Sequence, residues 1–376
     1  MQPKLDHISI KGFRSLAHIE KLRLNDVNVL IGANGSGKSN FVEAFSFFRA
    51  LRQANLQRYV AEAGGASQLL HFGAARTTEI SFRVSMNDEV DQYEITLAAT
   101  DSDGLRPVLE AAYYWSDKRT YSTPYKEDLT GGGVEAEIGS EYLPEQVAQV
   151  LQRCLGTWSK YQFDDTSRRS AIRLTADVND NRRLRTDGSN LAAFLYLLNE
   201  KHGDSLDVIQ RTVRLVAPFF DGFVLEPDAL NESRIRLQWR HRGSDAYFDA
   251  AALSDGTLRF IALATLFLQP SDLRPSIILL DEPELGLHPY AIAILSSVIK
   301  SVSAETQVLL ATQSPTLLDH FEPSDVLVAE RLDGSTRLER LDADRLESWL
   351  SRYSLGQLWE KNELGGRPGT EDRGGK

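Results

Sequence analysis

Residues 32–39 carry the pattern that most restricts how this chain can fold. They read Gly32, Ala33, Asn34, Gly35, Ser36, Gly37, Lys38 and Ser39, which matches G-x-x-x-x-G-K-[ST] in full. An apolar segment at residues 27–31 precedes the pattern, and apolar side chains at helical spacing follow it from residue 39 to about residue 59. The sequence therefore predicts a strand, a phosphate-binding loop and a helix in that order, within an α/β fold of the P-loop NTPase type.

The residue types in this loop suit the triphosphate of ATP. Glycines allow backbone N–H groups to turn inward around a phosphate, and the start of the helix adds the positive end of its dipole. Lys38 is expected to reach the β- and γ-phosphates, and the Ser39 hydroxyl to bind Mg²⁺. Asn40 follows directly and is expected to lie at the same site.

A second acidic element is needed to complete a magnesium site. Residues 277–282 read Ile-Ile-Leu-Leu-Asp-Glu, a buried strand that ends in two carboxylates, as in a Walker B motif. Adjacent strand residues point to opposite faces, so Asp281 and Glu282 are expected to differ in role. We expect Asp281 to bind Mg²⁺ through water and Glu282 to orient or deprotonate the attacking water.

Two further elements place polar groups where a phosphate could be bound. Ser254, Asp255 and Gly256 open a helix predicted over residues 255–268, and a helix N-terminus attracts anions. An ordinary helix cap explains the same residues. Gln313 follows an apolar strand at residues 308–311 and is placed to contact the γ-phosphate.

Hydrophobic periodicity divides the rest of the chain. Residues 78–140 alternate apolar and polar side chains between turns, which predicts an antiparallel β meander, and residues 141–217 are predicted to be helical. Apolar runs at residues 276–280 and 308–311 flanked by helices predict parallel strands. We expect an N-terminal ATPase lobe at residues 1–140, a helical insertion at 141–220, a C-terminal ATPase lobe at 221–340, and a C-terminal helix with a disordered tail at 341–376.

The net charge of −11 argues against a protein that coats nucleic acid with its whole surface. Three arginine clusters have two possible interpretations: they contact nucleic acid locally, or they are ordinary solvent-exposed faces. These are Arg168 and Arg169; Arg182, Arg183 and Arg185; and Arg234, Arg236, Arg240 and Arg242.

Targeting and cysteine content point to the cytoplasm. The first residues lack the apolar run of a signal peptide, and no stretch approaches the roughly 18 consecutive apolar residues of a membrane span. The single cysteine, Cys154, can form neither an internal disulfide nor a thiolate metal cluster, so we expect it to be a partly buried apolar residue.

Several motifs in order carry a resemblance to a known group. The phosphate loop, LSDGT at residues 253–257, ILLDEPELGLHP at 278–289 and ATQSP at 311–315 resemble the ABC-type ATPases of the RecF, SMC and OLD group. Residues 10–15 and 184–191 are also similar to stretches of RecF-like and OLD-like members, so that the resemblance covers most of residues 5–330.

The resemblance implies an ATPase head with a mixed core sheet, and a composite ATP site. LSDGT would be the signature motif, whose residues Ser254, Asp255 and Gly256 complete the γ-phosphate site of a second copy. ATP would then hold a homodimer head to tail, with a higher oligomer left open. His288 would lie at the dimer seam, Gln313 would occupy the switch position, and Arg14 would lie near the nucleotide.

The chain also departs from this group. Many relatives have histidine at the position of Gln313, so a proton-sharing or charged contact is replaced by a neutral hydrogen bond. This difference leaves the rate of turnover open, but not the binding of ATP. Gln68 and His71 are both candidates for the glutamine-loop residue, and a surface salt bridge is an equal interpretation of Arg14. No long heptad repeat is present, and the 46 residues after Glu330 (376 − 330) are too few for a TOPRIM nuclease. Asp342 and Asp344 are therefore expected at a solvated helix start.

These features support one leading hypothesis and two alternatives. The leading one is an ATP-hydrolysing dimer that controls a nucleic-acid process as the ATPase subunit of an antiphage defence system, with a separately encoded nuclease or toxin as effector. The first alternative is a RecF-like DNA repair clamp that uses the arginine clusters. The second is an ATP-sensing scaffold with little turnover. A membrane partner is not expected.

Overall fold

The computed structural model describes residues 3–116, 118, 120–143, 146–167 and 169–366. Its central layer is a six-stranded sheet in the order β17-β16-β3-β15-β14-β8. Strands β8, β14, β15, β3 and β16 run parallel to their neighbours, and β17 is antiparallel to β16. The bounds are β3 (Val27–Ile31), β8 (Trp158–Tyr161), β14 (Ile277–Asp281), β15 (Gln307–Ala311), β16 (Val326–Leu332) and β17 (Ser335–Arg340). The mixed, largely parallel core sheet is confirmed.

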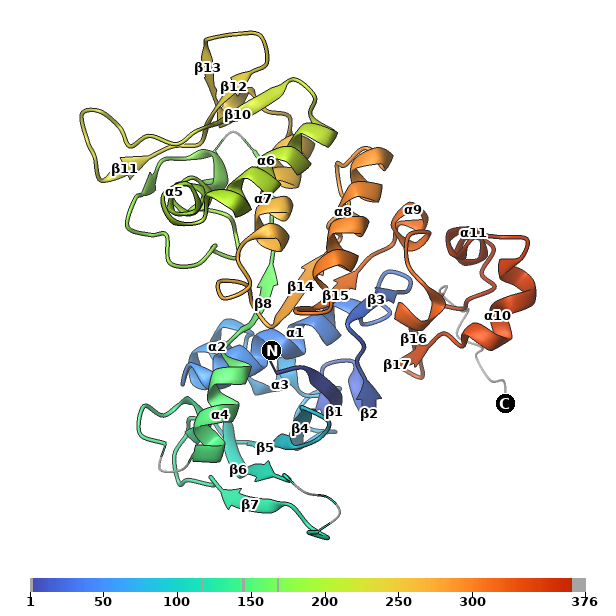
Figure 1. Cartoon of the computed structure of the whole chain (residues 1–376). Helices are drawn as coiled ribbons and strands as arrows, with labels where there is room; N and C mark the ends of the chain where they lie inside the picture. The colour runs from blue at the N-terminus through green and yellow to red at the C-terminus, as the bar shows by residue number, and fades with distance from the viewer. Residues whose placement is uncertain (1–2, 117, 119, 144–145, 168, 367–376) are drawn as a thin grey trace.

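A second, antiparallel sheet has the order β2-β1-β4-β5-β6-β7. The predicted meander forms four of its strands, and the N-terminal hairpin supplies the other two. The bounds are β1 (Leu5–Phe13), β2 (Leu16–Arg23), β4 (Glu79–Met86), β5 (Asp91–Ala99), β6 (Leu105–Tyr114) and β7 (Tyr125–Asp128). In Figure 1 this sheet occupies one end of the molecule, below the core sheet.

Helix α1 (Lys38–Arg52) fills the space between the two sheets. The ring centroid of Phe48 lies 5.1 Å from that of Phe82 in β4 and 5.3 Å from that of Trp158 in β8. Helices α2 (Leu56–Glu62), α3 (Ala66–Leu69) and α4 (Gln146–Leu155) and the 3-10 helix η1 (Glu137–Gly139) complete this side. One apolar cluster therefore fixes the P-loop helix against both sheets.

The other face of the core sheet supports a second group of elements, drawn at the top of Figure 1. Helices α5 (Leu191–Lys201), α6 (Gly203–Val216), α7 (Asp255–Leu268) and α8 (Pro289–Val302) pack here. Two small sheets adjoin them, β10 (Phe220–Val224) with β12 (Gln238–His241) and β13 (Tyr247–Asp249), and β9 (Ala176–Asp177) with β11 (Arg234–Ile235). The remaining elements are η2 (Ala171–Arg173), η3 (Ala250–Ala252), α9 (Pro315–Leu318), η4 (Pro323–Asp325), α10 (Ala343–Leu350) and α11 (Leu355–Glu360).

Two secondary-structure predictions are wrong in part. The stretch predicted to be helical from residue 141 to 217 contains β8, which is an edge strand of the core sheet. The helix predicted from residue 39 to 59 ends at Arg52, and a separate helix begins at Leu56. Between them Ala54 has a φ of 51°, a left-handed conformation that ends an α-helix.

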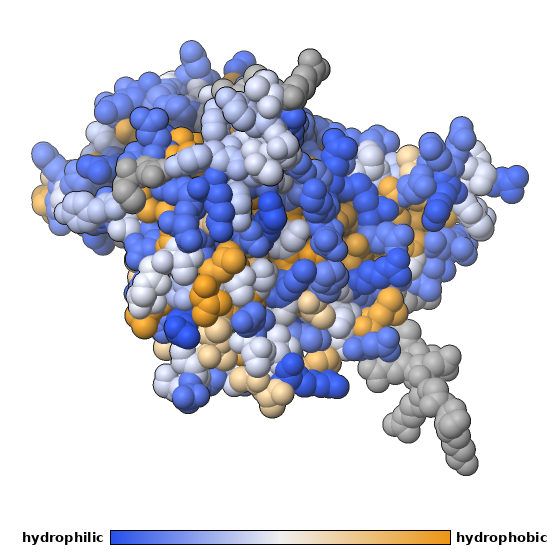
Figure 2. All heavy atoms as spheres, turned by 90° about the horizontal axis from the view of Figure 1, so that it is seen from below, coloured by the Kyte–Doolittle hydropathy of each residue, from blue (hydrophilic) through white to orange (hydrophobic). Residues whose placement is uncertain are grey.

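Other expectations agree with the structure where it describes them. Asp342 caps α10 and Asp344 lies in its first turn, while Cys154 is buried. Arg168, one of the two arginines of the first cluster, lies outside the described residues. So do residues 367–376, which make up most of the tail predicted to be disordered. Among described helices, none is long and apolar enough to cross a membrane. From below, the surface is mainly hydrophilic, with hydrophobic atoms in separate areas (Figure 2).

Candidate nucleotide-binding site

The P-loop lies between the carboxyl end of β3 and the start of α1, as predicted. Strand β3 is buried along all five residues and pairs with β15 on one side and β16 on the other. Gly37 precedes α1 with a φ of 103°, and a Cβ there would lie 1.9 Å from Thr336 Oγ1. A Cβ on Gly35 (φ 79°) would meet nothing within 4 Å. Glycine is therefore required by close packing at position 37 and by backbone conformation alone at position 35.

Lys38 extends back along the loop. Its Nζ donates to the carbonyl of Gly32 at 2.6 Å and to that of Ala33 at 3.0 Å, and the side chain is buried. Burial lowers the pKa of Lys38, while the charges of Asp281 and Glu282 oppose that shift. The ammonium is thus held near two carboxylates and two carbonyls, where phosphate oxygens are suitable acceptors.

The two carboxylates after β14 lie in the same pocket. Burial raises the pKa of Asp281; the charge of Lys160 opposes this shift, and that of Glu282 adds to it. Glu282 has a φ of 45° and donates its backbone N–H to the carbonyl of Ala311 at 2.7 Å. Glu282 is not in a strand conformation, so the rule that neighbouring strand residues point to opposite faces does not apply to Asp281 and Glu282. Both side chains line the pocket.

Gln313 contacts Glu282 directly. Its Nε2 donates to Glu282 Oε1 at 2.8 Å, which joins the end of β15 to the end of β14. The amide therefore fixes the carboxylate that is the candidate for orienting water.

These groups line one cavity of about 390 Å³. Its lining is Asn34, Gly35, Gly37, Lys38, Ser39, Asn40, Asp164, Asp281, Glu282, Leu285, Gln313 and Arg331. The hydroxyl of Ser39 and the carboxylate of Asp281 supply the oxygen ligands that Mg²⁺ prefers, with water and phosphate oxygens for the remaining positions. No group of three or more His, Cys, Asp or Glu suited to a metal occurs among described residues. This donor set therefore fits magnesium bound together with a nucleotide.

Three lining residues were not anticipated. Asp164 follows the edge strand β8, and its charge helps to raise the pKa of Asp281. Arg331 lies near the end of β16, and its Nη1 donates to the carbonyl of Gly35 at 3.2 Å. Leu285 follows the two carboxylates. The buried run at residues 326–329 followed by Glu330 and Arg331 repeats the pattern at the end of β14, and this was the available signal for Arg331.

The signature residues lie outside this cavity, at the start of α7. The Ser254 side chain accepts from the N–H of Thr257 at 3.2 Å and caps the helix, and Ser254 and Asp255 are exposed. A Cβ on Gly256 would lie 2.3 Å from the carbonyl oxygen of Gly286, so glycine is required there. Ser254 therefore acts as a helix cap, and the exposed Ser254 and Asp255 remain accessible to a second molecule.

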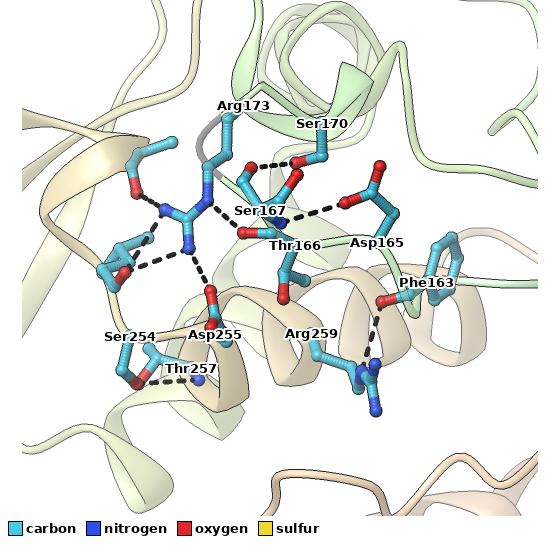
Figure 3. A network of polar contacts seen from close by, with 12 residues as sticks. Phe163, Asp165, Thr166, Ser167, Ser170, Arg173, Ser254, Asp255, Thr257 and Arg259 are labelled. Atoms are coloured by element: carbon cyan, nitrogen blue, oxygen red, sulfur yellow. Dashed lines mark hydrogen bonds and ion pairs between the residues drawn. The ribbon is translucent and has the colours of Figure 1, made fainter.

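Two arginines connect α7 to the segment after β8 (Figure 3). Arg173 donates to the carbonyls of Thr166 and Leu253 and pairs with Asp255 Oδ1 at 2.7 Å. Arg259 donates through Nε to the carbonyl of Phe163 at 3.1 Å and through Nη2 to that of Asp164 at 3.1 Å. The signature region is therefore joined to a residue that lines the nucleotide pocket.

The remaining candidates lie elsewhere. Arg14, Gln68 and His71 do not line the pocket; Nδ1 of His71 lies 2.6 Å from the carbonyl oxygen of Arg14. Gly32, Ala33 and Ser36 belong to the loop but are not among the residues that line the pocket. His288 is exposed and caps α8 by accepting from the N–H of Tyr290.

The fold and this site define a P-loop ATPase of the ABC type. Residues 27–319 match the family described as "AAA domain, putative AbiEii toxin, Type IV TA system", and the chain belongs to that family. The resemblance to the RecF and SMC group is confirmed.

Short alignments link the chain to RecF proteins. The DNA replication and repair protein RecF of Lacticaseibacillus casei is 30% identical over 95 residues, which is 25% of this chain and 24% of that protein. RecF of Anaeromyxobacter dehalogenans is 39% identical over 70 residues, 17% of this chain and 19% of that protein. The chain thus spans about a quarter or less of the length of these relatives.

Solved structures show the fold over nearly the whole chain. The Smc head bound to the C-winged helix domain of ScpA has a TM-score of 0.59 at 16% identity and covers 92% of this chain and 99% of its own. The Smc head of Pyrococcus furiosus, bound to the C-terminal domain of ScpA, has a TM-score of 0.59 at 15% identity, with 93% and 99% covered. The predicted P-loop NTPase head is therefore confirmed as the fold.

Proposed function

We propose that this chain binds and hydrolyses ATP with Mg²⁺, and that ATP pairs two copies head to tail. One arrangement carries the proposal. Residues of the P-loop line one pocket with Asp281, Glu282 and Gln313, while Ser254 and Asp255 of the signature motif are exposed outside it. A site completed by a second copy explains why both sets of groups occur in one chain.

The roles follow from the positions of the side chains. Lys38 would neutralise the β- and γ-phosphates, and Ser39 with Asp281 would hold the metal, which supplies charge stabilisation when bound. Glu282 would orient the attacking water and accept its proton, with Gln313 fixing the carboxylate. Ser254 and Gly256 of the second copy would bind the γ-phosphate.

The finer proposal is that pairing controls a nucleic-acid process as the ATPase subunit of an antiphage defence system with a separately encoded effector. The family description refers to a putative toxin and a type IV toxin–antitoxin system, which supports a link to such a system but does not name a separate effector. The RecF relatives support the alternative, a DNA repair clamp. Recovery of the native protein with a nuclease or toxin would favour the first function, and recovery with itself alone would count against it.

Phosphate release by three purified proteins tests the enzymatic part. Wild-type protein with Mg²⁺ should hydrolyse ATP, and removal of Mg²⁺ should stop it. Lys38→Ala should abolish ATP binding, whereas Glu282→Gln should bind ATP and lose about 100-fold or more in turnover. Normal turnover by Glu282→Gln would refute the catalytic assignment. ATP binding with negligible wild-type turnover would favour the scaffold alternative.

A further inference from the structure

A second cavity, of about 540 Å³, lies at the opposite end of α1 from the nucleotide pocket. We call it the arginine cleft because Arg49, Arg52, Arg183, Arg185 and Arg274 line it. Lys38 begins the 15-residue helix α1 and Arg52 ends it, a span of about 21 Å at 1.5 Å per residue. The arginine cleft is therefore separate from the site that binds ATP.

Positive charge exceeds negative charge in the arginine cleft. Among the described residues that line it, only Asp187 and Asp272 are acidic. Outside the lining, Asp180 pairs with Arg185 at 2.6 Å and Glu305 with Arg274 at 3.6 Å. Arg49 and Arg183 have no carboxylate partner among described residues. Such local excess stands out in a chain with a net charge of −11.

Arg49, Arg183 and Tyr161 line the same cavity. Burial raises the pKa of Tyr161 to about 12, and the charges of Arg49 and Arg183 oppose that shift. Arg49 comes from the last turn of α1 and Arg183 from the segment before α5. Compensation of the helix dipole accounts for arginine at the end of α1 but not for Arg183 or Arg185.

The chemistry of this lining suits phosphate groups. The planar guanidinium matches two phosphate oxygens at once, and Gln53 and Ser159 add neutral hydrogen-bonding groups. Tyr161 is only 4% exposed, so the arginine cleft offers no aromatic surface on which a base could stack. Recognition would therefore be of a phosphate backbone and not of bases.

Exposed arginines extend the positive surface beyond the cleft. Arg182 precedes Arg183, and Arg153 follows Gln152, whose carbonyl accepts from Arg52 Nε at 3.4 Å. Exposed cationic groups next to the lining residues in sequence favour a chain of phosphates over one small phosphate compound.

We propose that the arginine cleft binds the phosphodiester backbone of a nucleic-acid strand. The inference rests on the proposed function only in assuming a nucleic-acid partner.

Fluorescence anisotropy with a labelled 20-nucleotide single-stranded DNA tests the proposal. Wild-type protein with ATP should bind it, and the affinity should fall as salt is raised. The double variant Arg49→Glu/Arg183→Glu should bind at least about tenfold more weakly, with a shallower salt dependence. Both side chains are exposed, so the thermal melting temperature should be retained. Arg106→Glu, an exposed charge reversal on β6, is the matched control and should bind like wild type.

Equal affinity of the double variant and the control would overturn the proposal, as would absence of binding by wild-type protein at low salt. Inorganic tripolyphosphate is the second probe: if it binds in an Arg49- and Arg183-dependent manner and DNA does not, the site takes a small phosphate compound instead. ATP hydrolysis measured on the same preparations separates failure of the DNA-binding proposal from failure of the proposed ATPase function. Normal hydrolysis without DNA binding would contradict only the DNA-binding proposal.

Discussion

At the scale of single residues, the contact between Gln313 and Glu282 bears most directly on catalysis. The amide donates to Oε1 at 2.8 Å across the ends of two neighbouring strands. A neutral amide can hold the carboxylate in place, but it cannot exchange a proton with it. Gln313 is therefore expected to act by positioning the catalytic base.

Replacing Gln313 by leucine should lower the kcat for ATP hydrolysis by about tenfold, because a hydrogen bond to a charged group contributes about 1.5–3 kcal/mol and Gln313 is exposed. The KM for ATP should change little, since the amide contacts the carboxylate and not the P-loop. Gln313→His, which can still donate, should retain more activity. Steady-state phosphate release measures both constants, and a kcat for Gln313→Leu within twofold of wild type would contradict this role.

Sequence patterns identified the residues of the pocket that belong to contiguous motifs. Lys38, Ser39, Asp281, Glu282 and Gln313 each follow or end a strong apolar run, and the structure brings them together. Asp164 and Arg331 were missed because each reaches the pocket only through the order of the strands, although the apolar run at residues 326–329 did mark Arg331 as lying near a strand end. That order is fixed by packing over long sequence distances, and local periodicity carries no information about it.

At the scale of elements, Arg173 makes the contacts nearest to the signature residues at the start of α7. Arg173, whose side chain is 5% exposed, reaches the carbonyls of Thr166, Ala250 and Leu253 and the carboxylate of Asp255. These contacts fix the backbone that presents Ser254. The geometry of the signature motif thus depends on a residue 81 positions earlier in the chain (254 − 173 = 81).

Arg173→Ala should weaken ATP-dependent pairing of two copies by at least about tenfold and leave ATP affinity of the single chain within about twofold. Carbonyls left without donors should also reduce the free energy of unfolding by roughly 2 kcal/mol. Arg169→Ala, which removes an exposed arginine from the same segment, is the control. Sedimentation and binding of a fluorescent ATP analogue separate the two effects; equal losses in both would contradict a role specific to the signature motif.

For two elements, hydrophobic periodicity gave a wrong prediction of the secondary structure. Strand β8 is only four residues long and includes Ser159 and Lys160, so it lacks the apolar run of the other parallel strands. Helix α2 begins where the Glu135 carboxylate accepts from the N–H groups of Leu56, at 2.6 Å, and Gln57, at 3.0 Å. Because this cap comes from a residue 79 positions away, the apolar spacing across residues 39–59 resembled one continuous helix.

At the scale of the whole molecule, the order of motifs predicted the fold better than any single element did. The P-loop strand β3 lies beside β15, which lies beside β14, so the three parallel strands bring their carboxyl ends to one edge. The signature region is attached beside that edge but faces outward. We propose that the nucleotide pocket and the signature motif of one copy are the two complementary halves of a site that forms when two copies pair.

Sedimentation equilibrium of the Glu282→Gln variant with and without ATP and Mg²⁺ tests this claim most directly. The account predicts the monomer mass of 42.0 kDa without nucleotide and twice that mass with ATP. Adding Ser254→Arg to the same variant should return it to the monomer mass while ATP is still bound, since this side chain would block the γ-phosphate site of the partner. A monomer in saturating ATP, or a dimer unaffected by Ser254→Arg, would contradict the account.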